Sequence, residues 1–540
     1  MTRRRLGIFV VAALVAASCD GPAADPPSEA SPTVIPTGGA PTTTEPFEEG
    51  ADVLTVAISE PSTLDPMRLQ DPGGVLIARQ LYEGLTRWDP TEEEVVPAAA
   101  ESWDVSDGGR TFVFTLNPGM SFHDGTEVTS KDFKFAFERI ALKRNASDLA
   151  YLLEPIQGFV QANQIGGTRR LSGITAPDPL TLRIRLSRPF HDLPTVLTHP
   201  SLGPLPAKAV ADLDTFLRTP VGNGPFHIAQ AWSPGDPVLL KAFAGFLDTP
   251  EIDGIRFLTF PDAAASWLPF LDQRIDVAEV PAGEIEAAER EFGDQGSRPF
   301  LATYNFGLNM RSRALRRVKL RRAINRAIDR RTIVQTVYRG SMQEPRGIVP
   351  VGMPGFDENI CVNVCEFQPD AARRLVRGLP KKARRVTLEF SGGQPHPQVA
   401  RLVRSGLRDA GLQVKIRSFR FGKYLKRLRR GDHQMYRLGW IAEYPVADAF
   451  LSALFDSDSP DNHSGFASGK VDRLLERAHR TASEEVRQQL YLEAEKTIME
   501  SVPVVPIGSF VTHWAAHEWV EGLVFDQMGG FDAVGVDLAS

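Results

Sequence analysis

Val386-Thr-Leu-Glu-Phe390 and Leu412-Gln-Val-Lys-Ile416 are two strand-like stretches separated by a helical one. Val399, Val403 and Leu407 lie between them at the three- and four-residue spacing of one helix face. A strand, a helix and a strand in this order predict two parallel strands joined by a crossover helix. The chain is therefore expected to be an α/β protein.

The same reading extends outward from this unit. Thr129 is an expected helix N-cap, because Asp132 follows three residues later and apolar residues then recur at helical spacing. The expected strands are Val53–Ile58, Thr111–Leu116 and 180–186, and the expected helices are 74–87, 420–430, 470–480 and 483–500. Residues 314–339 are expected to be mainly helical. This mixture predicts mixed sheets, and no internal repeat of 20 to 50 residues is visible.

Length and composition set the limits of the fold. The chain has 540 residues, of which 42% are apolar and 24% charged, which allows about three or four domains. A net charge of −6, from 61 basic and 67 acidic residues, does not indicate a nucleic-acid-binding protein. No apolar run reaches the length of a membrane-spanning helix, which excludes a polytopic membrane protein.

The first 18 residues have the pattern of a secretory signal. Arg3, Arg4 and Arg5 precede 12 apolar or glycine residues, and the small residues 16–18 lead to Cys19. The ending Ala-Ala-Ser-Cys resembles a bacterial lipoprotein box, which implies cleavage before Cys19 and a diacylglycerol on its sulfur. The alternative is an ordinary signal peptide, residues 1–18, followed by an incidental cysteine.

Residues 19–50 are expected to form a disordered, lipid-anchored tether. From residue 20 this stretch is rich in Pro, Thr, Ala and Gly, and it carries six acidic residues and no basic one. A flexible tether of this length reaches about 30 Å. The folded part, from about residue 51 to 540, would then lie just outside a membrane.

Cys361 and Cys365 are the two cysteines outside the N-terminal segment. An exported protein meets an oxidising compartment, so a small structural disulfide between them is expected. A metal site would need more ligands than this segment offers, and no metal or other cofactor is expected.

Residues 311–430 are strongly basic, with 30 Lys and Arg residues against 8 Asp and Glu. These charges favour a solvated basic lobe. The alternatives are attraction to anionic lipid head groups and docking on an acidic partner.

A series of motifs runs in order through the folded part. They are Leu64-Asp-Pro66, Leu81-Tyr-Glu-Gly-Leu85, Ala100-Glu-Ser-Trp103, Phe122-His-Asp-Gly125, Val128-Thr-Ser-Lys-Asp-Phe133, Gly222-Asn-Gly-Pro-Phe226, Arg322-Ala-Ile-Asn-Arg-Ala-Ile-Asp329 and Gly439-Trp-Ile-Ala-Glu-Tyr-Pro445. Together they resemble the family 5 solute-binding proteins of ATP-driven (ABC) peptide and nickel importers, the oligopeptide-binding family.

The resemblance implies a hinged two-lobed periplasmic-binding-protein fold, type II of cluster C, with an extra inserted subdomain. The first lobe would combine 51–88, 218–302 and 505–540, the subdomain would be 89–217, and the second lobe 303–504. The lobes would close around a ligand, and a permease would recognise the closed form. The implied protein is a monomer without enzymatic activity, held at the outer face of the cytoplasmic membrane beside its permease and ATPase subunits.

A peptide importer must bind the groups that all peptides share. The backbone can be bound by strand addition, the ammonium by a carboxylate and the carboxylate by a cation. The resemblance assigns Glu443 to the ligand ammonium, Gly439 and Ile441 to backbone hydrogen bonds, and Arg437 to the ligand carboxylate. The alternatives are a surface or hinge carboxylate at Glu443 and a structural ion pair at Arg437.

Further candidates come from the same resemblance. Trp440 and Tyr444 belong to the binding strand, and Phe421 would be an aromatic wall or, alternatively, a core residue. Tyr304 and Asn305 would face the cleft or support the hinge. On the first lobe, the loop Asp71, Pro72 and Gly73 would flank the ligand, although Pro72 cannot donate a backbone hydrogen bond.

Three rival functions are considered. A hydrolase is disfavoured because the chain lacks a Gly-x-Ser-x-Gly elbow, and His517-Glu518 is followed by Glu521 where a zinc protease would have His. A different cargo on the same scaffold, such as a nickel chelate, haem, a sugar or another small solute, stays open. So does a surface receptor without an import role.

Overall fold

The computed structural model describes residues 47–362 and 364–539. The predicted signal peptide, Cys19 and most of the predicted tether therefore lie outside the described residues. Of residues 47–50, which the sequence places in the tether, Phe47 packs against the folded part and 48–50 are exposed. The ring of Phe47 is 5.9 Å from the guanidinium carbon of Arg256.

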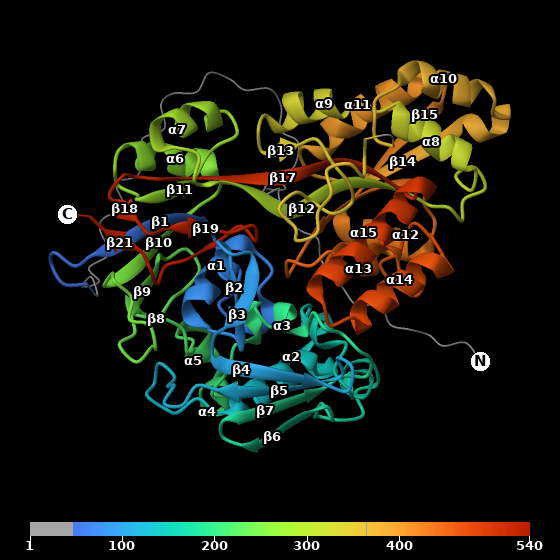
Figure 1. The fold of residues 1–540 in the computed structure, drawn as a ribbon. Coiled ribbons are helices and arrows are strands. Elements are labelled where there is room, and N and C mark those ends of the chain that lie inside the picture. Colours follow the sequence, from blue (N-terminus) through green and yellow to red (C-terminus); the bar gives the residue numbers. More distant parts are fainter. Residues whose placement is uncertain (1–46, 363, 540) are drawn as a thin grey trace.

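The described residues build an 11-stranded mixed sheet that runs through the length of the molecule (Figure 1). Its order is β15-β14-β16-β12-β17-β11-β1-β10-β9-β8, with β13 paired to β17. The bounds are β1 (Val53–Ser59), β8 (Phe226–Ile228), β9 (Val238–Ala242), β10 (Gly254–Phe260), β11 (Val277–Glu279), β12 (Ser297–Leu308), β13 (Met342–Gln343), β14 (Arg385–Ser391), β15 (Gln413–Phe419), β16 (Met435–Ile441) and β17 (Val504–Ala516).

Two long strands join the halves of this sheet. β12 and β17 pair antiparallel from Ser297↔His513 to Gly307↔Val504. At one end β17 also pairs with β11, and along its second half β12 pairs with β16. The sheet half around β1 is called the first lobe below, and the half around β16 the second lobe.

In the first lobe, three neighbouring strands of the large sheet are parallel. β1 lies between β10 and β11 and is parallel to both. Its residues 54–58 are buried, as expected for a strand covered on both faces. The helices of this lobe are α1 (Pro72–Leu81), α6 (Ala263–Leu271) and α7 (Ile285–Phe292).

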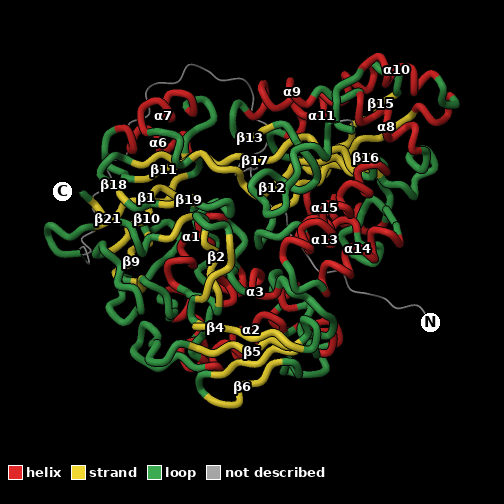
Figure 2. Tube along the Cα trace, viewed as in Figure 1, coloured by secondary structure: helices red, strands yellow, loops and turns green. Residues whose placement is uncertain are grey.

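The second lobe confirms the predicted strand–helix–strand unit. β14 and β15 are parallel, with Arg385 opposite Gln413, and α11 connects them. Tyr304 and Phe306 pack with α8 and α11 on one face of the sheet, whereas Trp440 and Val504 pack with α13 to α15 on the other. The helices, which Figure 2 shows in red, are α8 (Val318–Arg326), α9 (Arg330–Ile333), α10 (Pro369–Arg377), α11 (His396–Asp409), α12 (Phe421–Arg430), α13 (Asp448–Phe455), α14 (Gly469–Arg480) and α15 (Glu484–Ser501).

A four-stranded antiparallel sheet, β4-β5-β7-β6, lies below the large sheet in the view of Figure 1. With its helices it is called the small-sheet region, β4 to α5. The predicted cap of α2 is present: the Thr129 hydroxyl and backbone N–H both donate to Asp132, at 2.7 and 2.8 Å. The elements are β4 (Ala100–Ser106), β5 (Thr111–Leu116), β6 (Ile174–Asp178), β7 (Thr181–Arg185), α2 (Ser130–Ala141), α3 (Leu193–Val196), α4 (Ala207–Ala211) and α5 (Leu213–Arg218).

One helix prediction is wrong in its extent. The expected helix 74–87 ends at Leu81, and Thr86 starts a hairpin of β2 (Thr86–Asp89) and β3 (Glu94–Pro97). Gly84 explains the change of direction, because a Cβ there would be 2.6 Å from the carbonyl oxygen of Leu197. Short strand pairs, β18 (Val520–Glu521) with β21 (Asp537–Leu538) and β19 (Val524–Phe525) with β20 (Phe531–Asp532), complete the C-terminal end.

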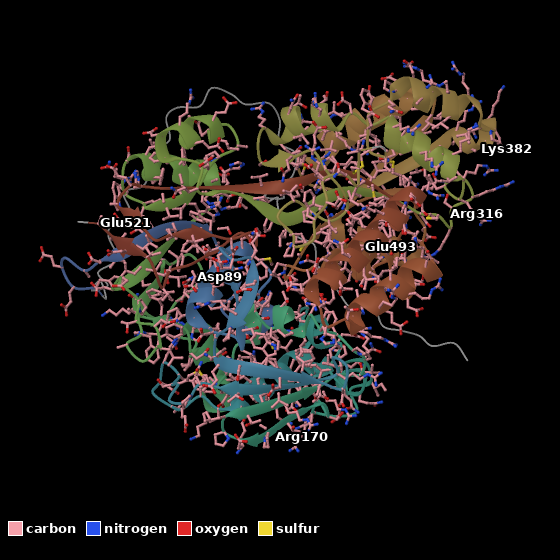
Figure 3. All side chains as sticks on the ribbon, in the orientation of Figure 1. Asp89, Arg170, Arg316, Lys382, Glu493 and Glu521 are labelled. Carbon is pink, nitrogen blue, oxygen red and sulfur yellow. A yellow bond between two sulfur atoms is a disulfide. The ribbon has the colours of Figure 1, made fainter. Side chains whose placement is uncertain are left out.

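Two features noted in the sequence, the cysteine pair and the basic segment, lie in the second lobe. Cys361 and Cys365 are bonded to each other, with their Cα atoms 4.9 Å apart. The basic residues of 311–430 lie largely on its outer side, where Figure 3 shows Arg316 and Lys382 pointing away from the rest of the protein. Among the described residues, no helix combines the length and apolarity needed to cross a membrane.

Candidate ligand-binding site

The strand β16 has an open backbone edge at its C-terminal end. Its partner β14 pairs only at Met435 and Tyr436. Past the end of β16, the Ala442 N–H donates to the Leu301 carbonyl on the β12 side at 2.8 Å. Because backbone groups alternate in direction along a strand, those of Gly439 and Ile441 face the edge that lacks a partner.

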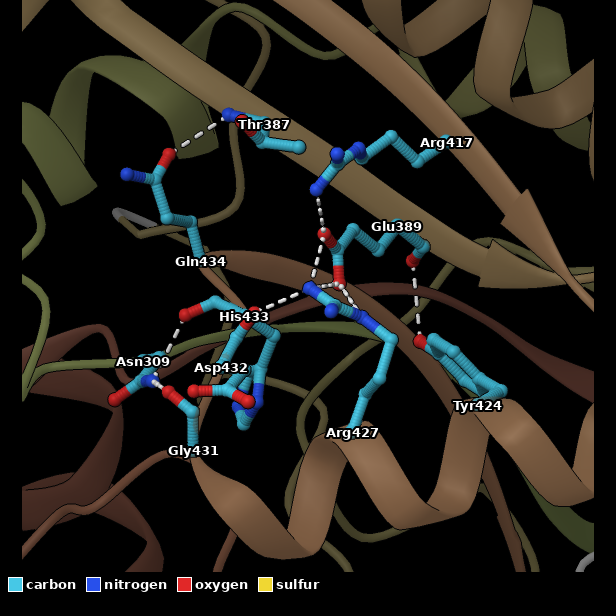
Figure 4. A network of polar contacts seen from close by, with 10 residues as sticks. All are labelled: Asn309, Thr387, Glu389, Arg417, Tyr424, Arg427, Gly431, Asp432, His433 and Gln434. Atoms are coloured by element: carbon cyan, nitrogen blue, oxygen red, sulfur yellow. Dashed lines mark hydrogen bonds and ion pairs between the residues drawn. The ribbon is translucent and has the colours of Figure 1, made fainter.

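A buried polar network holds this edge in place (Figure 4). Glu389 of β14 is only 1% exposed, and Arg427 of α12 donates to it from Nε at 3.2 Å and from Nη2 at 2.9 Å. The Tyr424 hydroxyl lies 3.1 Å from the Glu389 carbonyl and 2.7 Å from the Arg437 carbonyl. The network therefore ties α12 to β14 and β16 at the start of the open edge.

Arg437 is a buried cation without a counter-ion. Its residue is 9% exposed, and its guanidinium carbon lies 4.6 Å above the ring of Tyr304. Its Nε has no hydrogen-bond partner, and within residues 47–362 and 364–539 no carboxylate forms an ion pair with it. A buried guanidinium in this state suits an anionic group from outside the chain.

His396, at the start of α11, adds a neutral imidazole beside this cation. Its Nδ1 lies 3.3 Å from the Tyr304 hydroxyl. Burial, followed by the charge of Arg437, lowers the pKa of His396 to about 3, so the ring is neutral at ordinary pH. His396 was not predicted from the sequence, because the ten histidines of the chain are scattered and only the packing of α11 brings His396 near Arg437.

Glu443 lies between the second lobe and the small-sheet region. Its Oε2 is 3.4 Å from Nε2 of His199, and its side chain is 32% exposed. The His199 Nδ1 accepts from the Ser201 backbone N–H at 3.2 Å, so Nε2 is the nitrogen that carries a proton toward Glu443. Burial and then the negative charge of Glu443 raise the pKa of Tyr151 well above its ordinary value.

The other residues of the predicted binding strand have mixed placements. Trp440 is 6% exposed and donates from Nε1 to the Ala449 carbonyl at 2.6 Å, so its indole belongs to the core under α13. Tyr444 packs against the apolar clusters of both the small-sheet side and the second lobe. Phe421 is half-buried and belongs to none of the apolar clusters.

Asn305 faces away from Tyr304, on the α13 side of the sheet. It is 4% exposed, its Nδ2 donates to Thr303 Oγ1 at 2.8 Å, and its Oδ1 has no partner. A pocket of about 330 Å³ lies beside it, with walls that include Tyr436, Trp440 and Asp461.

The predicted first-lobe loop borders a second pocket. Asp71 caps α1 by accepting from the Gly74 N–H at 2.7 Å. A Cβ on Gly73 would be 2.2 Å from the Ser59 carbonyl, so glycine allows α1 to begin tightly against the end of β1. Pro72 and Gly73 line a pocket of about 520 Å³.

The small-sheet region and the second lobe are also in direct contact at the N-terminus of α3. Asp192, 3% exposed, lies 2.7 Å from Nε of Arg487 and accepts from the Tyr491 hydroxyl at 2.8 Å. The His191 N–H donates to the His479 carbonyl at 3.2 Å. These contacts connect α3 to α14 and α15 across the boundary between the two parts.

The paired strands β12 and β17 join the two lobes, and an open strand edge and an unpaired charge lie between them. These features define a hinged solute-binding protein. The chain belongs to the bacterial extracellular solute-binding proteins, family 5, whose middle-region model matches residues 94–462.

Named relatives cover most of the chain. A probable deoxycholate-binding periplasmic protein, YgiS of Escherichia coli, is 28% identical over 83% of this chain and 86% of its own. The oligopeptide-binding protein OppA of Bacillus subtilis is 24% identical, covering 89% and 92%. Haemophilus influenzae OppA, solved in complex with RPPGFSPFR, has a similar fold, with a TM-score of 0.72 and 21% identity over 91% of this chain and all of that one (100%).

Proposed function

We propose that the protein captures short peptides between its lobes and delivers them to the permease and ATPase subunits of an ABC importer. The observation that carries the proposal is β16 itself. It offers open backbone groups at Gly439 and Ile441, flanked by the cation Arg437 and the anion Glu443.

The spacing of the two charges suits a zwitterionic, extended ligand. Arg437 precedes the two open positions and Glu443 follows them, six positions apart in the sequence. A peptide added at this edge would pair its backbone with Gly439 and Ile441. Its carboxylate would approach Arg437 and His396, and its ammonium would approach Glu443.

The remaining candidates take supporting roles in this proposal. His199 and Tyr151 would orient the Glu443 carboxylate from the small-sheet region when the lobes are closed. Phe421, Tyr444 and Asn305 would contact ligand side chains, and the loop 71–73 would flank the ligand on the first lobe. Tyr304 would position Arg437, and Trp440 would support the strand from the core.

The cellular setting is part of the proposal. The basic, apolar and small residues ending at Cys19 support an exported lipoprotein, anchored at the outer face of the cytoplasmic membrane. The proposed lobes keep the sequence-based boundaries, with 89–217 inserted in the first lobe, and the protein would act as a monomer without enzymatic activity.

One observation favours a second candidate cargo. The relative that is 28% identical is a probable deoxycholate-binding protein, and deoxycholate has a carboxylate but no ammonium. Arg437 and His396 would suit such a ligand as well as a peptide. The charge on Glu443 separates the two candidates, because only a peptide would need it.

A thermal-shift screen tests the proposal. The purified protein is mixed with peptides of two to ten residues, with their N-acetylated and C-amidated forms, and with deoxycholate, a nickel chelate and sugars. A ligand at 100 times its dissociation constant stabilises the folded protein by about 2.7 kcal/mol. Stabilisation by free peptides that is lost on either modification supports both charge contacts.

Two variants and a control test the two charge contacts separately. Glu443→Gln should lose the preference for a free ammonium, and Arg437→Gln the preference for a free carboxylate, whereas the exposed Glu476→Gln should keep both. A shift with deoxycholate, a sugar or a chelate and none with any peptide would overturn the peptide assignment.

A further inference from the structure

The pocket of the first lobe lies at the carboxyl ends of three parallel strands. Ser59, Phe260 and Glu279 are the last residues of β1, β10 and β11, and all three line it. In open α/β sheets, ligands bind in the crevice outside these strand ends. The position is therefore a natural ligand position by topology alone.

The pocket also lies at the base of the two lobes. Gly529 is part of its wall, and a Cβ on Gly529 would be 3.1 Å from the ring of Phe300 in the connecting strand β12. The next residue back, Met528, packs against the apolar cluster of the second lobe. These contacts place the pocket beside the connecting strand β12 and next to residues that pack against the second lobe.

Glu279 is the unpaired charge in this pocket. Its side chain is exposed to the pocket, opposite Trp514 of β17. Within the described residues, its carboxylate has neither a hydrogen bond nor an ion pair. The surrounding protein raises the pKa of Glu279 by desolvation, without an opposing cation.

The other acidic group of the pocket has a structural role. Asp262 caps α6 by accepting from the Ala265 N–H through Oδ1 at 3.0 Å. The apolar walls come from Trp514, Phe260 and Leu76. The pocket thus combines apolar sides with Glu279, whose carboxylate has no such role among the described residues.

We infer that this pocket holds a cationic side chain of the ligand, lysine or arginine, with Glu279 as its counter-ion. The inference rests on the proposed peptide-binding function and names the ligand class that this pocket selects. The methylene groups of such a side chain would cover Trp514 and Phe260, and its charged end would meet the carboxylate. A neutral side chain would instead cover Glu279 without pairing it, which is unfavourable.

The test compares matched peptides by calorimetric titration of the whole protein. Tetrapeptides of alanine carry lysine at one of the four positions, and each has a partner with norleucine, which keeps the methylenes and removes the charge. At one position, lysine should bind about tenfold more tightly than norleucine or better. Glu279→Gln should remove that preference, and Glu286→Gln, an exposed residue of the neighbouring α7, should keep it.

Charge reversal gives a second readout. Glu279→Lys should favour glutamate over lysine at the same peptide position, and the melting temperature of each variant shows that it is folded. Tetrapeptides that bind wild type with a lysine preference unaltered by Glu279→Gln, or with no lysine preference at any position, would overturn this inference alone. Failure of all tetrapeptides to bind wild type would overturn the peptide function and this inference with it.

Discussion

The buried contact between Asp192 and α15 should control how readily the lobes close. In the described structure the Asp192 side chain bonds only to Arg487 and Tyr491, although it stands at the N-terminus of α3. Asp192→Asn removes its charge while keeping its shape. We therefore expect the variant to fold normally but to close less readily and bind its ligand more weakly.

The expected size follows from the burial of the pair. The Asp192 and Arg487 side chains are 3% and 11% exposed, and breaking a buried pair usually costs about 3–5 kcal/mol. Arg487 keeps its bonds to the Thr481 and Ala482 carbonyls. Burial also raises the pKa of Asp192 against the opposing effect of Arg487, so the pair does not fully offset its desolvation. These facts lower the expectation to about 2 kcal/mol, or about 30-fold in affinity.

Calorimetric titration with a peptide ligand measures the affinity, and small-angle X-ray scattering of the unliganded protein measures how open it is. The matched control is Glu154→Gln in the same region. Its pair with Arg188 is 34% and 53% exposed and should contribute about 0–1 kcal/mol. An affinity of Asp192→Asn within about threefold of wild type, with unchanged scattering, would refute the idea that this contact favours closure.

Three further predictions concern single side chains. His199→Ala should weaken binding of free peptides by about tenfold but leave N-acetylated peptides unaffected in calorimetry, because in the proposed site His199 acts on the ligand only through Glu443. Tyr424→Phe should lower the free energy of unfolding by about 1–3 kcal/mol in denaturant titration, since it removes the one hydroxyl proton that the Glu389 and Arg437 carbonyls share; an unchanged midpoint would contradict it. Burial raises the pKa of Glu495 to about 7, so its contribution to stability is present below its unfolded-state value and is lost as pH rises through about 7. Glu495→Gln should therefore be more stable than wild type by roughly 3 kcal/mol at pH 8 and similar to it at pH 4, and parallel pH profiles of the two would argue against this.

Local patterns predicted elements well where one stretch of chain contains the whole signal. The capping residues Thr129 and Asp132 fix the start of α2, and the alternation in 385–419 fixes two parallel strands and their helix. The predicted helix 74–87 failed because Gly84 must approach the backbone of Leu197, a contact 113 residues away that no local pattern contains.

The residues of the candidate site also differ in whether a local sequence pattern can identify them. Arg437, Gly439 and Ile441 lie on β16 and Glu443 follows two residues after its end, so a single motif locates them together. His396 was missed because α11 has to pack on the sheet before its first residue meets Tyr304. Likewise, Glu279 shows no signal in the sequence, since its importance comes from three strand ends that meet at one edge.

The sequence by itself determined the α/β class, the family resemblance and the charged segment around β16, because each is a property of consecutive residues and their periodicity. The tertiary structure alone decided which charges are paired. Asp192 meets Arg487 across 295 positions, whereas Arg437 and Glu279 form no ion pair among the described residues. The physical reason is that burial and pairing depend on distances in space. Folding around the paired strands β12 and β17 brings together residues that are far apart in the sequence and separates residues that are close in the sequence.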